Sequence, residues 1–174
     1  MMRFALYDYL PKRYQKRATF GQLDISRMII GFKDGRNIYS RWAALEFAHA
    51  MCMMNLSEVT LVCVPASTKC AHIRRWKLFS QLLSKYTGAT NGFEHIEVVG
   101  SRKRAHVTHE YELASNIKHC IKIDADFFRA RKVLVIDDIY TTGNSSSAFI
   151  GALKGAGADV VMAGFLARTR RFRV

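Results

Sequence analysis

Two kinds of hydrophobic pattern alternate along the chain. Short runs of aliphatic and β-branched residues at 59–65 and 132–137 predict buried strands, and weaker runs at 93–99, 120–123 and 160–166 predict three more. Strands separated by helices favour parallel pairing with right-handed crossovers. The pattern therefore predicts an α/β fold with an open, mostly parallel, doubly wound sheet of about five strands.

Apolar residues at helical spacing occupy the segments between these strands. The clearest helical face consists of Trp76, Leu78, Phe79, Leu82 and Leu83, with Gly88 beyond its end. Further helices are expected at 25–32 behind an Asp24 cap, from Ser40 towards Met54, and at 145–154, with a single turn at 113–119. Residues 1–58 are thus expected to form a helical hood packed on a core at 59–174, in one compact domain.

The composition indicates where the protein works. Hydrophobic residues make up 49% of the 174 residues, which is enough for a packed core, and no apolar run is long enough to span a membrane. The first ten residues do not have the pattern of a signal peptide. The four cysteines form no Cys-x-x-Cys pair, and Cys63 lies within an apolar run that predicts a core position. We therefore expect a soluble protein of the reducing cytoplasm.

The net charge of +13 favours a polyanionic partner: nucleic acid, a phosphorylated metabolite or an acidic surface. The basic residues concentrate at 12–17, 69–77, 102–104 and 168–173. Because these clusters are dispersed, a solvated basic surface without a dedicated partner is the alternative interpretation.

The segment 133–145 combines the residue types that bind phosphate and sugar. A hydrophobic run ends in Asp137 and Asp138, and two threonines, a glycine, an asparagine and a serine follow where a helix is expected to begin. A helix N-terminus with exposed N–H groups and hydroxyls binds a phosphate monoester. Two acids beside such a site suit a ligand that also presents hydroxyls and a divalent cation, as a ribose 5-phosphate does.

This segment resembles the signature of type I phosphoribosyltransferases: a hydrophobic run, two acids, two hydrophobic positions and Thr-Thr-Gly-x-Ser/Thr. Every position matches except Tyr140, where an aliphatic residue is usual. The resemblance implies the type I phosphoribosyltransferase fold, with 5-phosphoribosyl-1-pyrophosphate and Mg²⁺ as ligands. By position, Asp137 and Asp138 would be the catalytic acids that contact the ribose hydroxyls and hold Mg²⁺ partly through water. The 5-phosphate loop would comprise Ile139, Tyr140, Thr141, Thr142, Gly143, Asn144 and Ser145.

Two further elements follow the order expected in this family. A pyrophosphate loop would be formed after the first core strand by Ala66, Ser67, Thr68 and Lys69. A flexible loop that reaches the leaving pyrophosphate would carry Arg102, Lys103 and Arg104. An ordinary turn and a solvated charged loop remain the alternatives for these two segments.

The wider layout is similar to the ComF (competence protein) branch of the family. Lys33-Asp-Gly35, Val64-Pro65, Asn116 and the signature follow one another at similar spacing. The branch's Arg-Gly-Phe-Asn corresponds to positions 74–77, where Arg74 and the aromatic Trp76 match. Its N-terminal cysteine finger is absent.

Two functions are expected from these resemblances. The first is an enzyme of nucleotide metabolism that transfers phosphoribosyl from the pyrophosphate donor to a nitrogen nucleophile such as a nucleobase. The second is an accessory protein of DNA uptake or nucleic-acid metabolism that keeps the pocket for sensing, or without use, and performs no transfer. The sequence identifies neither the acceptor nor the oligomeric state, for which a homodimer is one option. It also does not show which of the two functions the protein has.

Overall fold

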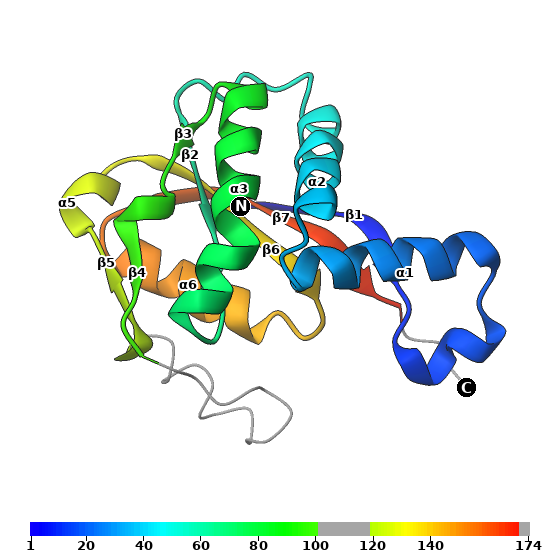
Figure 1. The fold of residues 1–174 in the computed structure, drawn as a ribbon. Helices are drawn as coiled ribbons and strands as arrows, with labels where there is room; N and C mark the ends of the chain where they lie inside the picture. The colour runs from blue at the N-terminus through cyan, green and yellow to red at the C-terminus, as the bar shows by residue number, and fades with distance from the viewer. Residues whose placement is uncertain (101–118, 171–174) are drawn as a thin grey trace.

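The fold is built on a five-stranded sheet in which every neighbouring pair of strands is parallel. The computed structural model describes residues 1–100 and 119–170 (Figure 1). Across the sheet the strands follow the order β1-β7-β6-β2-β3. Their bounds are β1 Met2–Tyr9, β2 Val59–Cys63, β3 Thr90–Asn91, β6 Lys132–Tyr140 and β7 Asp159–Thr169. The prediction of an open α/β sheet of about five strands is confirmed.

Helices cover both faces of this sheet (Figure 1). One face carries α1 (Phe20–Lys33), α2 (Asn37–Ala50) and α3 (Lys69–Thr87), and the other carries α6 (Asn144–Gly155). The short elements are α5 (Ala125–Phe128) and the 3-10 turns η1 (Lys12–Arg17) and η2 (Phe93–His95). None of the helices in the described residues is both long and apolar enough to cross a membrane.

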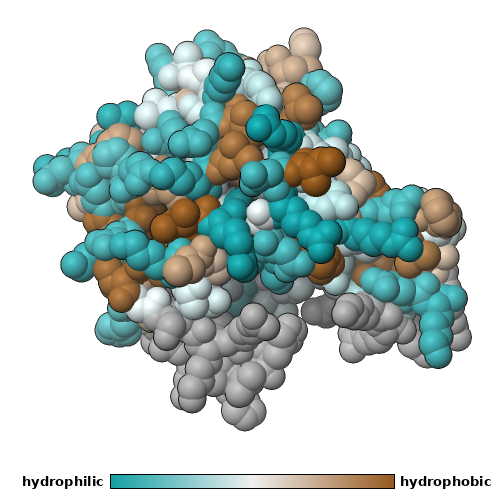
Figure 2. Space-filling view, in the orientation of Figure 1, coloured by the Kyte–Doolittle hydropathy of each residue, from teal (hydrophilic) through white to brown (hydrophobic). Residues whose placement is uncertain are grey.

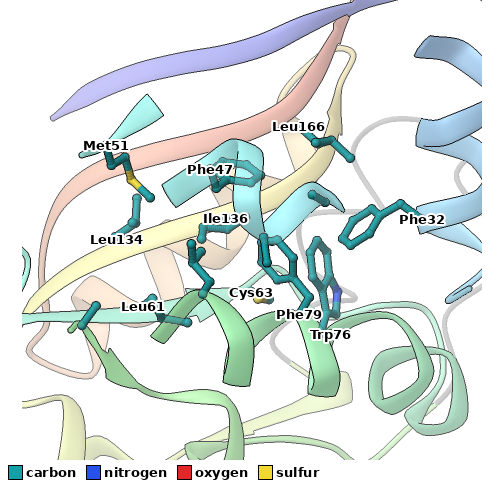
Figure 3. Packing of buried hydrophobic residues seen from close by; sticks show 14 of the residues in the cluster. Phe32, Phe47, Met51, Leu61, Cys63, Trp76, Phe79, Leu134, Ile136 and Leu166 are labelled. Atoms are coloured by element: carbon teal, nitrogen blue, oxygen red, sulfur yellow. The ribbon is translucent and has the colours of Figure 1, made fainter. Parts of the chain in front are cut away.

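Two hydrophobic clusters fill the space between the sheet and its helices. In the first, Phe32, Phe47, Trp76 and Phe79 meet edge to face over the sheet, with ring centroids 5.3 to 5.7 Å apart (Figure 3). Such aromatic pairs stabilise a core beyond the apolar area that they bury. Cys63 is buried in the same cluster, as its apolar run predicts. The second cluster joins α6 to the opposite face through Phe149, Ile150 and Leu153. Figure 2 shows one outer face, where hydrophilic residues predominate among the described residues and hydrophobic patches stand between them.

The N-terminal segment departs from the prediction of a purely helical hood. β1 pairs in parallel with β7, from Met2 opposite Met162 to Tyr9 opposite Thr169, and forms one edge of the main sheet. Helix α1 begins at Phe20 rather than at residue 25, because Thr19 and Gln22 form a capping box. The first strand was not predicted, because an edge strand has one neighbour and a weak hydrophobic pattern.

Helix α2 begins at Asn37, before the predicted cap at Ser40. Ser40 lies buried inside the helix, where its hydroxyl donates to the carbonyl oxygen of Arg36 at 3.4 Å. A serine can satisfy its hydroxyl in this way within a helix as well as at its start. The helix ends at Ala50, so Met54 lies outside it.

The runs at 93–99 and 120–123 form a separate ribbon rather than strands of the main sheet. β4 (Ile96–Val98) pairs with β5 (Ile121–Ile123) in an antiparallel arrangement, and 93–95 form the turn η2. In β4, Glu97 is exposed between two buried residues. This alternation is typical of an antiparallel strand with one solvent-exposed face, whereas the buried strands of a parallel sheet are apolar throughout.

Candidate functional site

The chain order of the strands places a topological switch point between β2 and β6. From β6 the chain continues through α6 to β7 on one side, and from β2 it continues through α3 to β3 on the other side. Helices α6 and α3 therefore start at the same edge of the sheet but lie on opposite faces. Open α/β sheets bind their ligands at the carboxyl ends of the strands where the order reverses in this way.

The two acids of the signature lie where β2 separates from β6. The pairing between these strands ends at Cys63 opposite Ile136, and the amide of Val64 makes one more bond to the carbonyl oxygen of Ile136 at 2.8 Å. β6 itself continues to Tyr140 against β7, so Asp137 and Asp138 belong to the strand rather than follow its end. One side of β6 is thereby open towards the segment after β2.

Asp137 has an unusual electrostatic environment. Its carboxylate accepts the amide of Asp138 at 2.9 Å. Burial raises its pKa well above the ordinary value, the charge of Asp138 adds to the rise, and Arg75 and Lys33 oppose it. Burial and the nearby Asp137 carboxylate also raise the pKa of the Cys63 thiol. A carboxyl with a raised pKa beside a ligand crevice is a candidate proton acceptor or donor.

Asp138 is held by an arginine that the sequence analysis left without a role. Nη1 of Arg75, from α3, donates to Oδ2 of Asp138 at 2.7 Å, and the other carboxylate oxygen accepts the amide of Ile139 at 2.6 Å. Nε of Arg75 also donates to the carbonyl oxygen of Lys33 at 3.0 Å. Arg75 therefore joins the ends of α1 and β6 to α3.

Helical spacing is the signal that could have identified this arginine. Arg75 lies next to Trp76 and one turn before Phe79, both buried, in the helix that follows β2. A charged residue at the margin of a buried helical face requires a partner. Helical spacing alone does not identify Asp138 as the acid that pairs with Arg75.

The segment after the two acids leads into the N-terminus of α6. Gly143 is the N-cap of α6 in the left-handed conformation, at φ 82°, and no side chain caps the helix. The amide of Ser147 is the first to bond within the helix, to Gly143 at 2.8 Å. Within the part of the chain that the structure describes, the amides of residues 141–146 have no hydrogen-bond acceptor. Such a row of N–H groups binds an anion, and the helix dipole favours it.

Tyr140, the one departure from the signature, has a packing role. Its ring meets Phe165 edge to face at 4.8 Å and belongs to the margin of the cluster under α6. The same ring lies against Gly143, where an added Cβ would be 2.6 Å from Cε2 of Tyr140. Gly143 is therefore required both by its backbone angle and by this close approach.

The predicted pyrophosphate loop, residues 66–69, leads into α3 at the same edge of the sheet. Oγ1 of Thr68 caps α3 by accepting the amide of Ala71 at 3.2 Å, and Lys69 forms an exposed ion pair with Glu97 at 3.6 Å. Ala66 is buried and Ser67 is half-buried. The amides of residues 66–70 find no acceptor among the described residues. The loop thus offers a second row of N–H groups, while Thr68 and Lys69 are engaged elsewhere.

The acids do not form a metal site by themselves. Across residues 1–100 and 119–170, no three His, Cys, Asp or Glu side chains gather in a way that could hold a metal ion. The Oδ2 atom of Asp138 is occupied by Arg75. The residues present therefore do not fit a protein-bound Mg²⁺ in this arrangement.

The flexible-loop candidates Arg102, Lys103 and Arg104 lie outside the described residues, as do Asn116 and most of the helical turn expected at 113–119.

Comparison with known protein families gives no matching family model, and no curated protein matches the sequence.

Proposed function

We propose that this chain binds 5-phosphoribosyl-1-pyrophosphate at the switch point between β2 and β6 and transfers its phosphoribosyl group to a nitrogen nucleophile such as a nucleobase. The proposal includes a fold of the type I phosphoribosyltransferase kind. Its ligand carries a phosphate on one end of the ribose and a pyrophosphate on the other. The proposed orientation puts the 5-phosphate at the start of α6 and the pyrophosphate at the start of α3.

One observation carries the proposal: two helices begin beside the switch point, and both present, at the same edge of the sheet, amides that have no acceptor among the described residues. The row at 141–146 follows the signature acids, and the row at 66–70 follows the neighbouring strand β2. A ligand with two anionic groups matches two such rows. Asp137 and Asp138 lie just before the first row, where β2 separates from β6, and they would accept the hydroxyls of a ribose.

The chemistry proposed for this site is a substitution at the anomeric carbon. The bond from that carbon to pyrophosphate breaks, and pyrophosphate leaves with the electron pair. The nucleophile's nitrogen forms the new bond and releases its proton, for which Asp137 is the candidate acceptor because its pKa is raised. The N–H groups contribute by orienting the phosphates and stabilising their charge. The Mg²⁺ implied by the resemblance would be carried by the oxygen atoms of the donor.

The accessory function in nucleic-acid metabolism is a second proposal, and the net charge of +13 favours it. Titration with single-stranded and duplex DNA at several salt concentrations distinguishes the accessory proposal from the transferase proposal. Binding through DNA phosphates would fall steeply with salt, by a factor of roughly a thousand or more between 50 and 200 mM for six or more contacts. Salt-sensitive DNA binding without turnover of a nucleobase would favour the accessory role.

The transferase proposal is tested by calorimetry with 5-phosphoribosyl-1-pyrophosphate, with and without Mg²⁺, on the wild type and on Gly143→Ala. The substitution adds a methyl group that collides with Tyr140 and strains the left-handed backbone, so the amide row should move. We expect the dissociation constant to rise by about tenfold or more, corresponding to a loss of at least ~1.4 kcal/mol. Incubation with nucleobases then tests transfer.

Gly151→Ala is the matched control, because Gly151 lies in the same helix with open space around its missing Cβ. This change should leave binding unaltered and stabilise the helix by about 0.5–1 kcal/mol. Wild-type protein that fails to bind the donor, or Gly143→Ala protein that binds it as tightly as the wild type, would contradict the proposal.

A further inference from the structure

The ion pair between Arg75 and Asp138 differs from the other ion pairs in the described residues in how deeply it is buried. Its side chains are 15% and 10% exposed, whereas the other pairs expose at least one partner by 46% or more. A guanidinium buried to this extent has lost most of its hydration. Its burial is tolerated only if its N–H groups find hydrogen-bond acceptors within the protein. The contacts around it supply them.

Two negative groups hold the guanidinium from different directions. Nη1 faces Oδ2 of Asp138 at 2.7 Å, and Nε faces the carbonyl oxygen of Lys33 at 3.0 Å. Lys33 is the last residue of α1, so its carbonyl belongs to the negative end of that helix dipole. The guanidinium carbon also lies 5.9 Å from the ring centre of Trp76. The cation thus occupies a prepared position beside the acid pair.

We infer that Arg75 takes the place of a divalent cation at Asp138. The guanidinium neutralises the carboxylate and covers the oxygen that a metal ion would need. With Arg75 in position, Asp138 is not a metal ligand, and its carboxylate adds little repulsion for an anionic ligand at the adjacent loops. The relevance to a phosphorylated ligand rests on the proposed function, whereas the exclusion of a metal ion from Asp138 does not.

The test uses Mn²⁺ alone, with the full chain and no sugar phosphate, and follows free Mn²⁺ by electron paramagnetic resonance. The wild type should bind no Mn²⁺ at this site, and its net charge of +13 keeps background binding low. Arg75→Gln should bind one Mn²⁺ per chain at least tenfold more tightly than the wild type. Arg75→Gln combined with Asp138→Asn should lose that ion.

Arg129→Gln is the matched control, since Arg129 makes a comparable 2.8 Å bond to Asp126 but both side chains are exposed. It should not gain Mn²⁺. The inference is overturned if Arg75→Gln binds no more Mn²⁺ than this control, or if the wild type already holds an ion that Asp138→Asn removes.

A second measurement covers the case in which Arg75→Gln does not fold. The Nε–H resonance of Arg75 in the wild type, identified by its loss in Arg75→Lys, should keep its line width when Mn²⁺ is added at a low ratio to protein. Strong paramagnetic broadening of that resonance would place the ion at Asp138 and overturn the inference. Neither experiment contains a ribose phosphate. A negative result would therefore overturn the inference about Arg75 without bearing on the proposed function, which calorimetry with 5-phosphoribosyl-1-pyrophosphate tests separately.

Discussion

Asp137 and Asp138 are adjacent in sequence but differ in the partners that balance their charge. Asp138 is compensated by Arg75 at 2.7 Å. Asp137 is half-buried near Cys63 and its pKa is raised, while the pKa of Asp124, hydrogen-bonded to His95, is lowered. Two neighbouring carboxyls with different environments can divide their roles, one keeping its charge and the other exchanging a proton. In the proposed transfer, this difference makes Asp137 rather than Asp138 the candidate proton acceptor.

The raised pKa of Asp137 has a consequence for stability. The folded protein keeps this proton at pH values where the unfolded chain has released it, so the folded state binds more protons. The contribution of Asp137 to the free energy of unfolding then falls as the pH rises above about 3.9, the ordinary pKa of an aspartate. Asp137→Asn should remove this contribution, so the variant should gain stability relative to the wild type as the pH increases.

Urea unfolding of both proteins at a series of pH values from 4 upwards measures the effect. Asp126→Asn is the control, because Asp126 is 91% exposed, and its pH dependence should follow that of the wild type. A difference between Asp137→Asn and the wild type that stays constant with pH would show that Asp137 carries no raised pKa.

At the scale of elements, the end of α1 and the first half of α3 must pass very close to each other for Arg75 to reach Lys33. Gly35, just after α1, permits this approach: a Cβ there would lie 2.4 Å from Cγ and 2.7 Å from the backbone oxygen of Arg74. Its φ of 74° also lies in the left-handed region. Packing and backbone conformation both require glycine at this contact.

Gly35→Ala should therefore cost more than backbone strain alone. Gly88 has the same φ of 74° but open space around it, so Gly88→Ala measures the strain by itself. We expect about 1–2 kcal/mol for the left-handed alanine in both variants. Gly35→Ala should lose about 1–3 kcal/mol more from overpacking.

Equilibrium denaturation of the two variants and the wild type gives these differences. Equal losses in the two variants would mean that α1 and α3 can separate at Gly35 without cost.

The elements that could be predicted from sequence are those with a strong local pattern. β2 and β6 are continuous apolar runs, and the face of α3 repeats at helical spacing. β1 was missed because Arg3 and Asp8 interrupt a short run, and its pairing with β7 depends on residues far along the chain. The Arg75–Asp138 contact joins positions 63 apart, so no local pattern reveals it. The sequence located both acids at the end of the hydrophobic run that forms β6, but it could not show that one of them is paired with Arg75.

At the scale of the whole molecule, the N-terminal residues and the core share a single hydrophobic interior. Phe32 and Phe47, from α1 and α2, pack against the aromatic residues of α3 over β2, β6 and β7 (Figure 3). β1 adds an edge strand to the same sheet. The division into residues 1–58 and 59–174 predicted from sequence can be tested by separating the two parts.

We expect a fragment consisting of residues 59–174 not to fold. Without 1–58, only α3 would cover the face of the sheet that carries Leu61, Leu134, Ile136 and Leu166, and the apolar surface that α1 and α2 leave exposed favours aggregation. Circular dichroism and urea unfolding should show no cooperative transition. A chain ending at Arg170 keeps every described strand and serves as the control, with a transition like that of the full chain. Cooperative unfolding of the fragment would show that 59–174 is an autonomous unit.

The pairing of β1 with β7 also determines when the sheet can be completed during synthesis. Asp8 and Arg168, which form an ion pair across these two strands, are 160 positions apart. At about 5–20 residues per second, the nascent β1 must wait roughly ten to thirty seconds before its partner leaves the ribosome. During that interval its backbone is open to strands of other chains, and the charges of Arg3 and Asp8 are the kind that discourage such pairing. The same two residues that obscure β1 in the sequence thus protect it while the protein is being made.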